Sequence, residues 1–325
     1  MENSASHELL LSQSKVLGDV QKDYHQAKYL SSDPLEYVHR YKDPLDQETV
    51  ALLAALLAYG NVKQIRKSVE EALRRMALVA NSPREFVSGL DDSAFNKKAG
   101  RVFENYVHRF NSGQDLINLF WLLNQSRKKH GSLGSHFLTH HSPGAETIET
   151  ALISLLAEWR SWLIAKKSPQ TKSPGLAFLL SSPAGGSCCK RWCMFLRWMG
   201  RKDQLDLGLW NSDSPLSFTF PSSNHGLIAS QLIMPLDTHT GRISQYLGLT
   251  QRKTLDWKAA VEVTQALKRI DPHDPTRYDF ALARLGILDL CQRRYREEIC
   301  KKCQLLPACH FAQTFLSGPS SSMPS

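Results

Sequence analysis

The sequence lacks the long hydrophobic runs of membrane proteins. Its longest nearly apolar run, Val50 to Tyr59, is far shorter than the roughly 20 residues that span a bilayer. The N-terminus has no basic start followed by an apolar stretch, so we expect no secretion signal and a cytoplasmic location. Alternating apolar and polar segments are missing, and β-branched clusters are scarce. These absences exclude a membrane bundle and argue against a β-sheet protein.

Composition and charge narrow the remaining classes. Hydrophobic residues make up 42% of the 325 residues and charged residues 22%, which excludes a disordered or collagen-like chain. This length allows one large domain or two ordinary ones. Forty Lys and Arg residues against 31 Asp and Glu residues leave a net charge of +9. An excess of this size favours a polyanionic partner, either nucleic acid or a membrane surface.

Helical periodicity runs through almost the whole chain and predicts an all-α protein. Polar composition predicts surface loops at 128–142 and 166–173, and the serine-rich tail 317–325 is expected to be disordered. The expected helices cover residues 46–59, 62–79, 93–110, 114–129, 144–166, 174–180, 188–200, 238–247, 256–268 and 275–290.

Four of the seven cysteines lie close together near the C-terminus. Cys291, Cys300, Cys303 and Cys309 are separated by eight, two and five residues. The two-residue gap lets both thiolates reach one metal centre, and the outer pair completes four-coordination. A compact loop with a single close pair favours a [4Fe–4S] cluster. Zinc is the alternative metal. A third interpretation is four buried cysteines that bind no metal.

The cysteine loop is also rich in basic side chains. A metal centre would hold them as a rigid convex patch that fits a phosphate backbone. The other interpretation is an ordinary solvated run of charge. The basic residues of this loop are Arg293, Arg294, Arg296, Lys301 and Lys302.

A glycine-rich turn opens the helix expected from residue 188. Gly185, Gly186 and Ser187 precede it, and Lys190 and Arg191 lie in its first turn. Backbone N–H groups at a helix start can hold a phosphate oxygen, to which the two cations would add charge. Most turns of this kind are only connectors, so both interpretations stay open.

Asp237 lies where an extended segment enters the helix expected from residue 238. As an N-cap it would accept a hydrogen bond from a backbone N–H of the first turn. As a carboxylate facing a cleft it could orient water or stabilise a developing cation. The two roles are compatible. His239 and Arg242 would be its neighbours, as structural or phosphate contacts.

In this order, the turn, the aspartate and the cysteine loop resemble the helix-hairpin-helix DNA glycosylases of the endonuclease III type. Leu236-Asp237-Thr238-His239-x-x-Arg242 is similar to the aspartate motif of that superfamily, and the two- and five-residue cysteine gaps are similar to its cluster loop. Residues 52–61 and 62–73 resemble the helix pair that opens the glycosylase core. The likeness covers about residues 45–110 and 180–310.

Within the superfamily the chain looks most like a bacterial group of proteins of unknown function. This closer resemblance is carried by residues 189–192, 195–199, 206–210 and 279–282. The first gap of the cysteine loop is longer than is usual in the superfamily. Lyase members also place a nucleophilic lysine where Cys188 or Cys189 falls here, and Lys190 comes one or two positions later.

The resemblance implies a base-excision repair enzyme that acts as a monomer on double-stranded DNA near the nucleoid. It would flip a damaged or mispaired base out of the duplex, and Asp237 would stabilise the sugar cation. Lys190 would be a lyase nucleophile or a phosphate ligand. Tyr59 or Asn61 would wedge into the emptied stack, although core packing is equally expected for Tyr59. The cluster would shape a DNA-binding loop without redox chemistry.

The resemblance also implies two helical lobes with DNA between them. A core of residues 46–235 carries the hairpin and an insert, and residues 236–316 form a cluster lobe against which residues 1–45 pack. Two other functions remain open. One is a non-enzymatic iron–sulfur DNA-binding module that has lost the base pocket; the other is a zinc-stabilised scaffold that binds RNA or protein.

Overall fold

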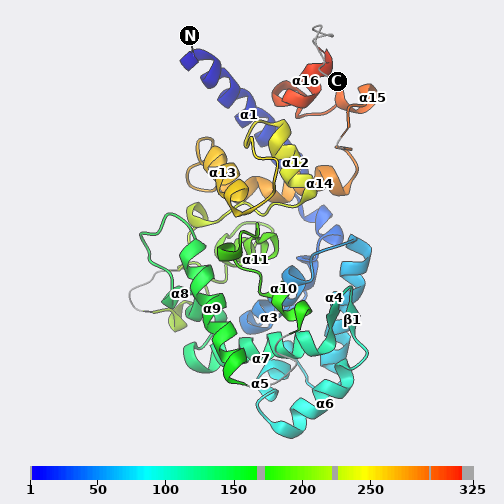
Figure 1. The fold of residues 1–325 in the computed structure, drawn as a ribbon, viewed down its shortest axis with the longest axis vertical. Helices are drawn as coiled ribbons and strands as arrows, with labels where there is room; N and C mark the ends of the chain where they lie inside the picture. Colours follow the sequence, from blue (N-terminus) through cyan, green and yellow to red (C-terminus); the bar gives the residue numbers. More distant parts are fainter. Residues whose placement is uncertain (1, 167–172, 222–225, 293, 317–325) are drawn as a thin grey trace.

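The computed structural model describes residues 2–166, 173–221, 226–292 and 294–316. Within these ranges the chain is mostly helical, which confirms the predicted all-α class. Figure 1 shows a larger body in the lower part of the view and a smaller body above it, which holds both ends of the chain. None of the helices in the described ranges combines the length and the apolar character that crossing a bilayer requires.

In the described residues the larger body contains ten α-helices and one small hairpin. Two antiparallel strands of two residues each, β1 (Val107–His108) and β2 (Asn111–Ser112), form the hairpin. The helices are α2 (Glu36–His39), α3 (Pro44–Leu56), α4 (Val62–Ala77), α5 (Pro83–Gly89), α6 (Ser93–Phe103), α7 (Gly113–His130), α8 (Leu133–Thr139), α9 (Glu149–Ala165), α10 (Pro174–Leu179) and α11 (Lys190–Gly200).

The smaller body joins the N-terminal helix to the C-terminal third of the chain. α1 packs against α14 and against the short 3-10 segments η6 and η7. By contrast, α2, which we expected in the same lobe as α1, packs against α3 in the larger body. The elements of the smaller body are α1 (Glu2–Tyr24), α12 (Thr238–Tyr246), α13 (Trp257–Lys268), η6 (Pro275–Tyr278), α14 (Asp279–Ile287), α15 (Glu297–Cys300), η7 (Leu306–Ala308) and α16 (His310–Leu316).

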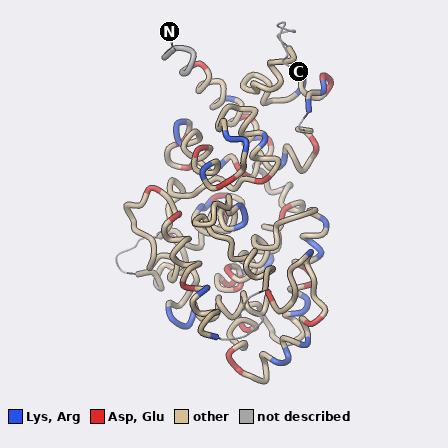
Figure 2. The backbone as a smooth tube through the Cα atoms, in the orientation of Figure 1, with Lys and Arg blue, Asp and Glu red and all other residues tan. Residues whose placement is uncertain are grey.

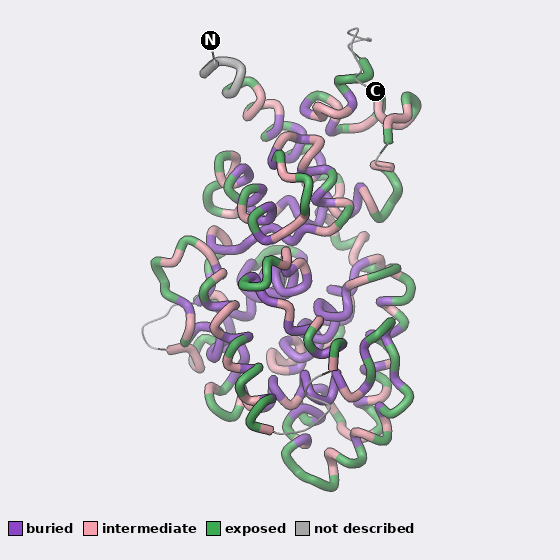
Figure 3. The backbone as a smooth tube through the Cα atoms, in the orientation of Figure 1, coloured by how far each residue is buried: buried purple, intermediate pink, exposed green. Residues whose placement is uncertain are grey.

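α3 and α11 pack together at the centre of the larger body. Residues 50–56 of α3 and Leu57, which follows the helix, are fully buried. Trp192, Phe195 and Trp198 of α11 are fully buried too. Figure 3 shows buried segments gathered at the centre of the larger body. A helix that is apolar on all sides has to be enclosed by other elements. The central position of α11 therefore fixes where its first residues lie.

Buried ion pairs connect the end of α11 with the smaller body. Arg197 contacts Asp206, at 3.1 Å, and Asp279 at the start of α14. Arg201 lies 2.8 Å from both Asp206 and Asp274. Removing one member of such a network leaves a buried charge without a partner, which costs more free energy than an exposed pair contributes. The network therefore holds the two bodies in a defined arrangement.

Several predicted boundaries differ from the structure. The expected loop at 128–142 contains α8, so that prediction is wrong. The helix expected at 93–110 ends at Phe103 because the β1–β2 hairpin follows it, and the one expected at 275–290 is divided into η6 and α14. The predicted tail 317–325 and most of the predicted loop 166–173 lie outside the described residues.

Candidate functional site

A cavity of about 1290 Å³ is lined by residues from both bodies. Lys190 reaches it from the start of α11, Asp237 from the start of α12 and Asp279 from the start of α14. Tyr59 and Asn61, between α3 and α4, line the same space. The structure thus brings together both predicted catalytic residues and both predicted wedge residues. A cavity of this size exceeds the usual small-molecule pocket of about 300–1,000 Å³.

The Asp237 carboxylate caps α12 and also faces the cavity. Its Oδ1 accepts hydrogen bonds from the backbone N–H groups of His239, at 2.8 Å, and Thr240, at 2.9 Å. Its Oδ2 points toward Lys190. Burial raises the pKa of Asp237, but the charge of Lys190 and the two N–H donors outweigh burial and hold the pKa below its ordinary value. The group is therefore an ionised, oriented carboxylate.

Lys190 lies beside this carboxylate. Its Nζ is 3.7 Å from Oδ2 of Asp237 and donates a 3.2 Å hydrogen bond to the carbonyl oxygen of Ala58. Cys189, the residue before α11, adopts a left-handed conformation with φ 48°, so the helix begins at Lys190. The late position of this lysine in the sequence therefore does not keep it from the cavity.

Asp279 is a second carboxylate of the cavity wall that we did not predict. Burial raises its pKa to about 6, against the opposing influence of Arg197, and the nearby Asp237 adds to the rise. Two carboxylates in one cavity thus have pKa values displaced in opposite directions, a pattern common at catalytic sites. The sequence offered no local signal for this role, because Asp279 comes close to Asp237 only in the folded chain.

The glycine turn differs from the predicted phosphate site. Gly185 and Gly186 are exposed, but their N–H groups donate to the carbonyl oxygens of Ser182, at 3.0 Å, and Pro183, at 2.8 Å. These two donors are therefore used within the turn. Among the described residues no side chain caps α11, so the first N–H groups of that helix are the donors that could face an anion. The hydroxyl of Ser187 accepts from the N–H of Cys189 at 3.2 Å and lines the cavity.

Arg191, a predicted phosphate contact, is buried in the wall of the cavity, and its guanidinium is used inside the fold. Its guanidinium donates to the carbonyl oxygens of Leu56, at 3.0 Å, and Phe178, at 2.5 Å, and lies 3.7 Å from the centre of the Phe178 ring. The residue is 6% exposed. Burial lowers the pKa of Arg191 to about 10, which leaves the group charged at pH 7. Its donors link α11 to α3 and α10.

Of the two predicted wedge residues, Tyr59 is held in place. Its hydroxyl contacts the side-chain oxygen of Asn111 and lies 3.1 Å from the carbonyl oxygen of His108. Its ring packs edge-on against Phe178, with centroids 4.9 Å apart, and burial raises its pKa to about 12. Core packing therefore describes Tyr59 better than insertion does. Asn61 is exposed, and its side chain caps α4 through the N–H of Lys63.

The four C-terminal cysteines line one small cavity with apolar walls. It measures about 30 Å³ and includes Cys291, Cys300, Cys303 and Cys309. The backbone N–H of Arg296 donates to Sγ of Cys300 at 3.5 Å. Within the described part of the chain, no three of these sulfurs lie within 4.8 Å of one another.

Acidic neighbours balance part of the predicted basic patch. Arg296 lies 3.9 Å from Glu298, and Lys301 contacts Glu297. Blue and red segments accordingly alternate near α15 in Figure 2. Three further predicted contacts, Arg242 on α12 together with Arg294 and Lys302, are exposed, whereas Arg293 lies outside the described residues.

Comparison with known families identifies the chain only at the level of a family. Residues 33–288 match the protein family described as "Protein of unknown function (DUF2400)". The chain belongs to this family. No curated protein and no solved structure matches it. The DUF2400 match includes Lys190, Asp237 and Asp279 and ends before Cys291. The resemblance to the glycosylases therefore stays a prediction.

Proposed function

We propose that this protein is a DNA N-glycosylase that excises a damaged or mispaired base from double-stranded DNA. The observation that carries the proposal is the meeting of Asp237 and Lys190 in one large cavity between the two bodies. A glycosidic bond cannot be reached inside a stacked duplex, so such an enzyme needs a space for an everted nucleotide. The cavity of about 1290 Å³ offers that space.

Asp237 supplies the charge that the reaction needs. Breaking the bond between C1′ and the base leaves positive charge on the sugar, and a fixed carboxylate stabilises that charge as it develops. The cap hydrogen bonds to Oδ1 hold the group, while Oδ2 remains directed into the cavity. The low pKa of Asp237 keeps it ionised at neutral pH.

Lys190 is the proposed nucleophile of a following or concerted lyase step. Its ammonium group lies 3.7 Å from Oδ2 of Asp237 before substrate binds. One ammonium proton passes to the departing base, which also keeps the electron pair of the C1′–base bond, and the neutral amine forms a bond to C1′ while Asp237 stays ionised. Cleavage of the C1′–O4′ bond then opens the sugar, and a proton moves from the new secondary ammonium group to O4′. This leaves a protonated Schiff base between Lys190 and C1′.

The cysteine loop is proposed to hold a [4Fe–4S] cluster. Two features support the proposal: four thiols line one apolar cavity, and the backbone N–H of Arg296 donates to Sγ of Cys300. The cavity of about 30 Å³ is smaller than a four-iron cluster, so the loop would have to widen around the cluster. The cluster would supply a structural link between α14, α15 and α16 and no redox step. Anaerobically purified protein is expected to be brown and to contain stoichiometric iron and sulfide. Cys300→Ser and Cys303→Ser should lose both, whereas Cys188→Ser, in the other cavity, should keep them; colourless protein with zinc would contradict the cluster.

Excision over a panel of lesion-containing duplexes tests the function. Asp237→Asn keeps a good N-cap residue but removes the charge, so DNA binding should persist while single-turnover excision falls at least about 100-fold. Asp256→Asn is the matched control, because Asp256 caps α13 outside the residues that line the cavity. Unchanged excision in Asp237→Asn would overturn the mechanism. No excision of any lesion by the native protein would favour the non-enzymatic DNA-binding module.

A further inference from the structure

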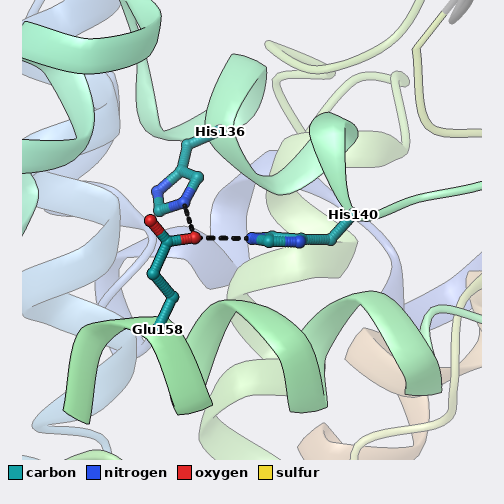
Figure 4. Close-up of side chains that lie close together, drawn as sticks. All are labelled: His136, His140 and Glu158. Atoms are coloured by element: carbon teal, nitrogen blue, oxygen red, sulfur yellow. Dashed lines mark hydrogen bonds and ion pairs between the residues drawn. The ribbon is translucent and has the colours of Figure 1, made fainter. Parts of the chain in front are cut away.

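Three side chains converge on one point of the larger body (Figure 4): His136 of α8, His140 directly after α8, and Glu158 of α9. Nε2 of His136 and Nε2 of His140 each lie 3.1 Å from Oε2 of Glu158. The three possible ligand atoms are all within 4.8 Å of one another. The four-residue spacing of the histidines places both rings on the same side of one helical turn. None of the three is among the described residues that line the Asp237 cavity.

A buried hydrogen bond fixes the orientation of the His136 ring. The Ser126 hydroxyl lies 2.9 Å from Nδ1 of His136, accepts from the indole N–H of Trp159 at 2.9 Å and donates to the carbonyl oxygen of Leu122 at 3.1 Å. All of these groups are satisfied when Nδ1 of His136 donates to Ser126. Histidines that bind metals usually donate their second ring nitrogen in this way.

In that tautomer the neutral His136 ring directs a lone pair at the Glu158 carboxylate. A lone pair and a carboxylate oxygen 3.1 Å apart repel one another unless a cation lies between or beside them. His140 approaches the same oxygen from a second direction. Two imidazole nitrogens and one carboxylate oxygen are a donor set that suits zinc and related divalent ions.

We propose that His136, His140 and Glu158 bind a divalent transition-metal ion, with zinc as the expected ion and one coordination position open to solvent. The side chain of His136 is fully buried, whereas those of His140 and Glu158 are 23% and 30% exposed, so the open position lies on their side. Three protein ligands with a fourth position left for water are the arrangement of open zinc sites.

The surroundings support a fixed site. The His136 ring stacks on Trp162, with centroids 5.2 Å apart, and on His130 at 4.3 Å. Lys129 lies 3.7 Å from Oε1 of Glu158, so it contacts the oxygen that the histidines leave free. A bound ion would fasten α8 to α9.

Titration of the 325-residue chain with cobalt(II) alone tests the site, and the absorption spectrum separates it from the cysteine loop. We expect one equivalent to bind with the ligand-field spectrum of nitrogen and oxygen ligands and without sulfur-to-cobalt charge transfer. Zinc should displace it. His140→Gln and Glu158→Gln, at partly exposed positions, should weaken binding at least about 100-fold, because each removes a ligand. His273→Gln, an exposed control, should bind as the native protein does.

Ser126→Ala separates orientation from ligation, because it leaves all three ligands in place. Loss of this hydrogen bond should weaken cobalt binding by about 10- to 100-fold. Native-like affinity in both His140→Gln and Glu158→Gln would overturn the proposal. Cobalt that binds only with a thiolate spectrum would overturn it too. Excision activity takes no part in this test, so its outcome is independent of the glycosylase proposal.

Discussion

The two oxygens of the Asp237 carboxylate have separate partners. Oδ1 is held by the first turn of α12, and Oδ2 faces Lys190 and the cavity. The same side chain can therefore cap a helix and act on a substrate without changing position. The sequence predicted the cap, which the structure confirms, because an N-cap aspartate is recognisable from the residues around it. The action on a substrate stays a prediction.

Asp203, another aspartate with a displaced pKa, links stability to pH. Burial raises its pKa, but a hydrogen bond from His25 and the charge of Arg201 outweigh burial and hold it well below the ordinary value. Folding therefore favours the ionised form. This contribution is fully present above the unfolded pKa of about 3.9 and is lost as the pH falls toward the folded value.

We therefore predict that Asp203→Asn lowers the free energy of unfolding by about 2 kcal/mol at pH 7 and by about 1 kcal/mol at pH 3. Urea unfolding at several pH values measures the difference. A gap between native and variant that stays constant from pH 7 to pH 3 would contradict the assignment.

Other residue roles could not be predicted, because burial is not visible in a motif. Arg191 follows a glycine turn, as a phosphate ligand would, yet its guanidinium is used by the carbonyl oxygens of Leu56 and Phe178. Tyr59 is held by contacts with residues 108 and 111 in the hairpin. Both assignments depend on neighbours more than ten residues away, which local spacing does not reveal.

At the scale of elements, the turn before α11 depends on one glycine more than on the other. A side chain at either Gly185 or Gly186 would meet only open space, so steric contact does not distinguish the two. Backbone conformation does, because Gly186 has φ +77°, which residues other than glycine rarely adopt. The backbone N–H of Trp257 also donates a 3.2 Å hydrogen bond to the carbonyl oxygen of Gly186, which connects the turn to α13.

We predict that Gly186→Ala lowers stability by about 1–2 kcal/mol and weakens duplex binding, because the left-handed conformation becomes strained. Gly185→Ala is the matched control and should stay within about 0.5 kcal/mol of the native protein. Thermal unfolding and a duplex titration measure both effects. Equal stability of the two variants would show that the turn is not constrained as described.

Helix α8 lies in a segment for which the sequence predicted a loop. The segment around it is polar, but Leu133 and Phe137 are fully buried, and the N–H groups of Leu133 and Gly134 donate to the Glu48 carboxylate, at 3.2 and 3.0 Å. A distant buried acid thus stabilises the helix start. Longer helices such as α4, α7 and α11 were predictable, because their periodicity extends over several turns.

At the scale of the whole molecule, the cavity exists because two bodies meet at fixed positions. Arg284 of α14 lies 2.6 Å from Asp33 and donates to the carbonyl oxygen of Tyr29 at 3.2 Å, so it joins the smaller body to the chain before α2. Its guanidinium is almost fully buried and lies 4.2 Å from the centre of the Phe280 ring.

We predict that Arg284→Met lowers the free energy of unfolding by about 3–5 kcal/mol, because Asp33 is left buried without its partner. Arg242→Met, at an exposed position of α12, is the control and should change stability by less than about 0.5 kcal/mol. Chemical unfolding of both variants measures the two changes in the free energy of unfolding. A loss below about 1 kcal/mol in Arg284→Met would mean that this contact does not hold the two bodies together.

The central claim is that Lys190 and Asp237 act together on the sugar of a nucleotide in the cavity. Borohydride trapping on duplex DNA with an abasic site tests it most directly. Native protein should form a stable covalent adduct, Lys190→Gln should form none, and Lys63→Gln, which changes another lysine of the cavity wall, should form as much as native protein. Absence of an adduct with native protein, or an undiminished adduct with Lys190→Gln, would contradict the claim.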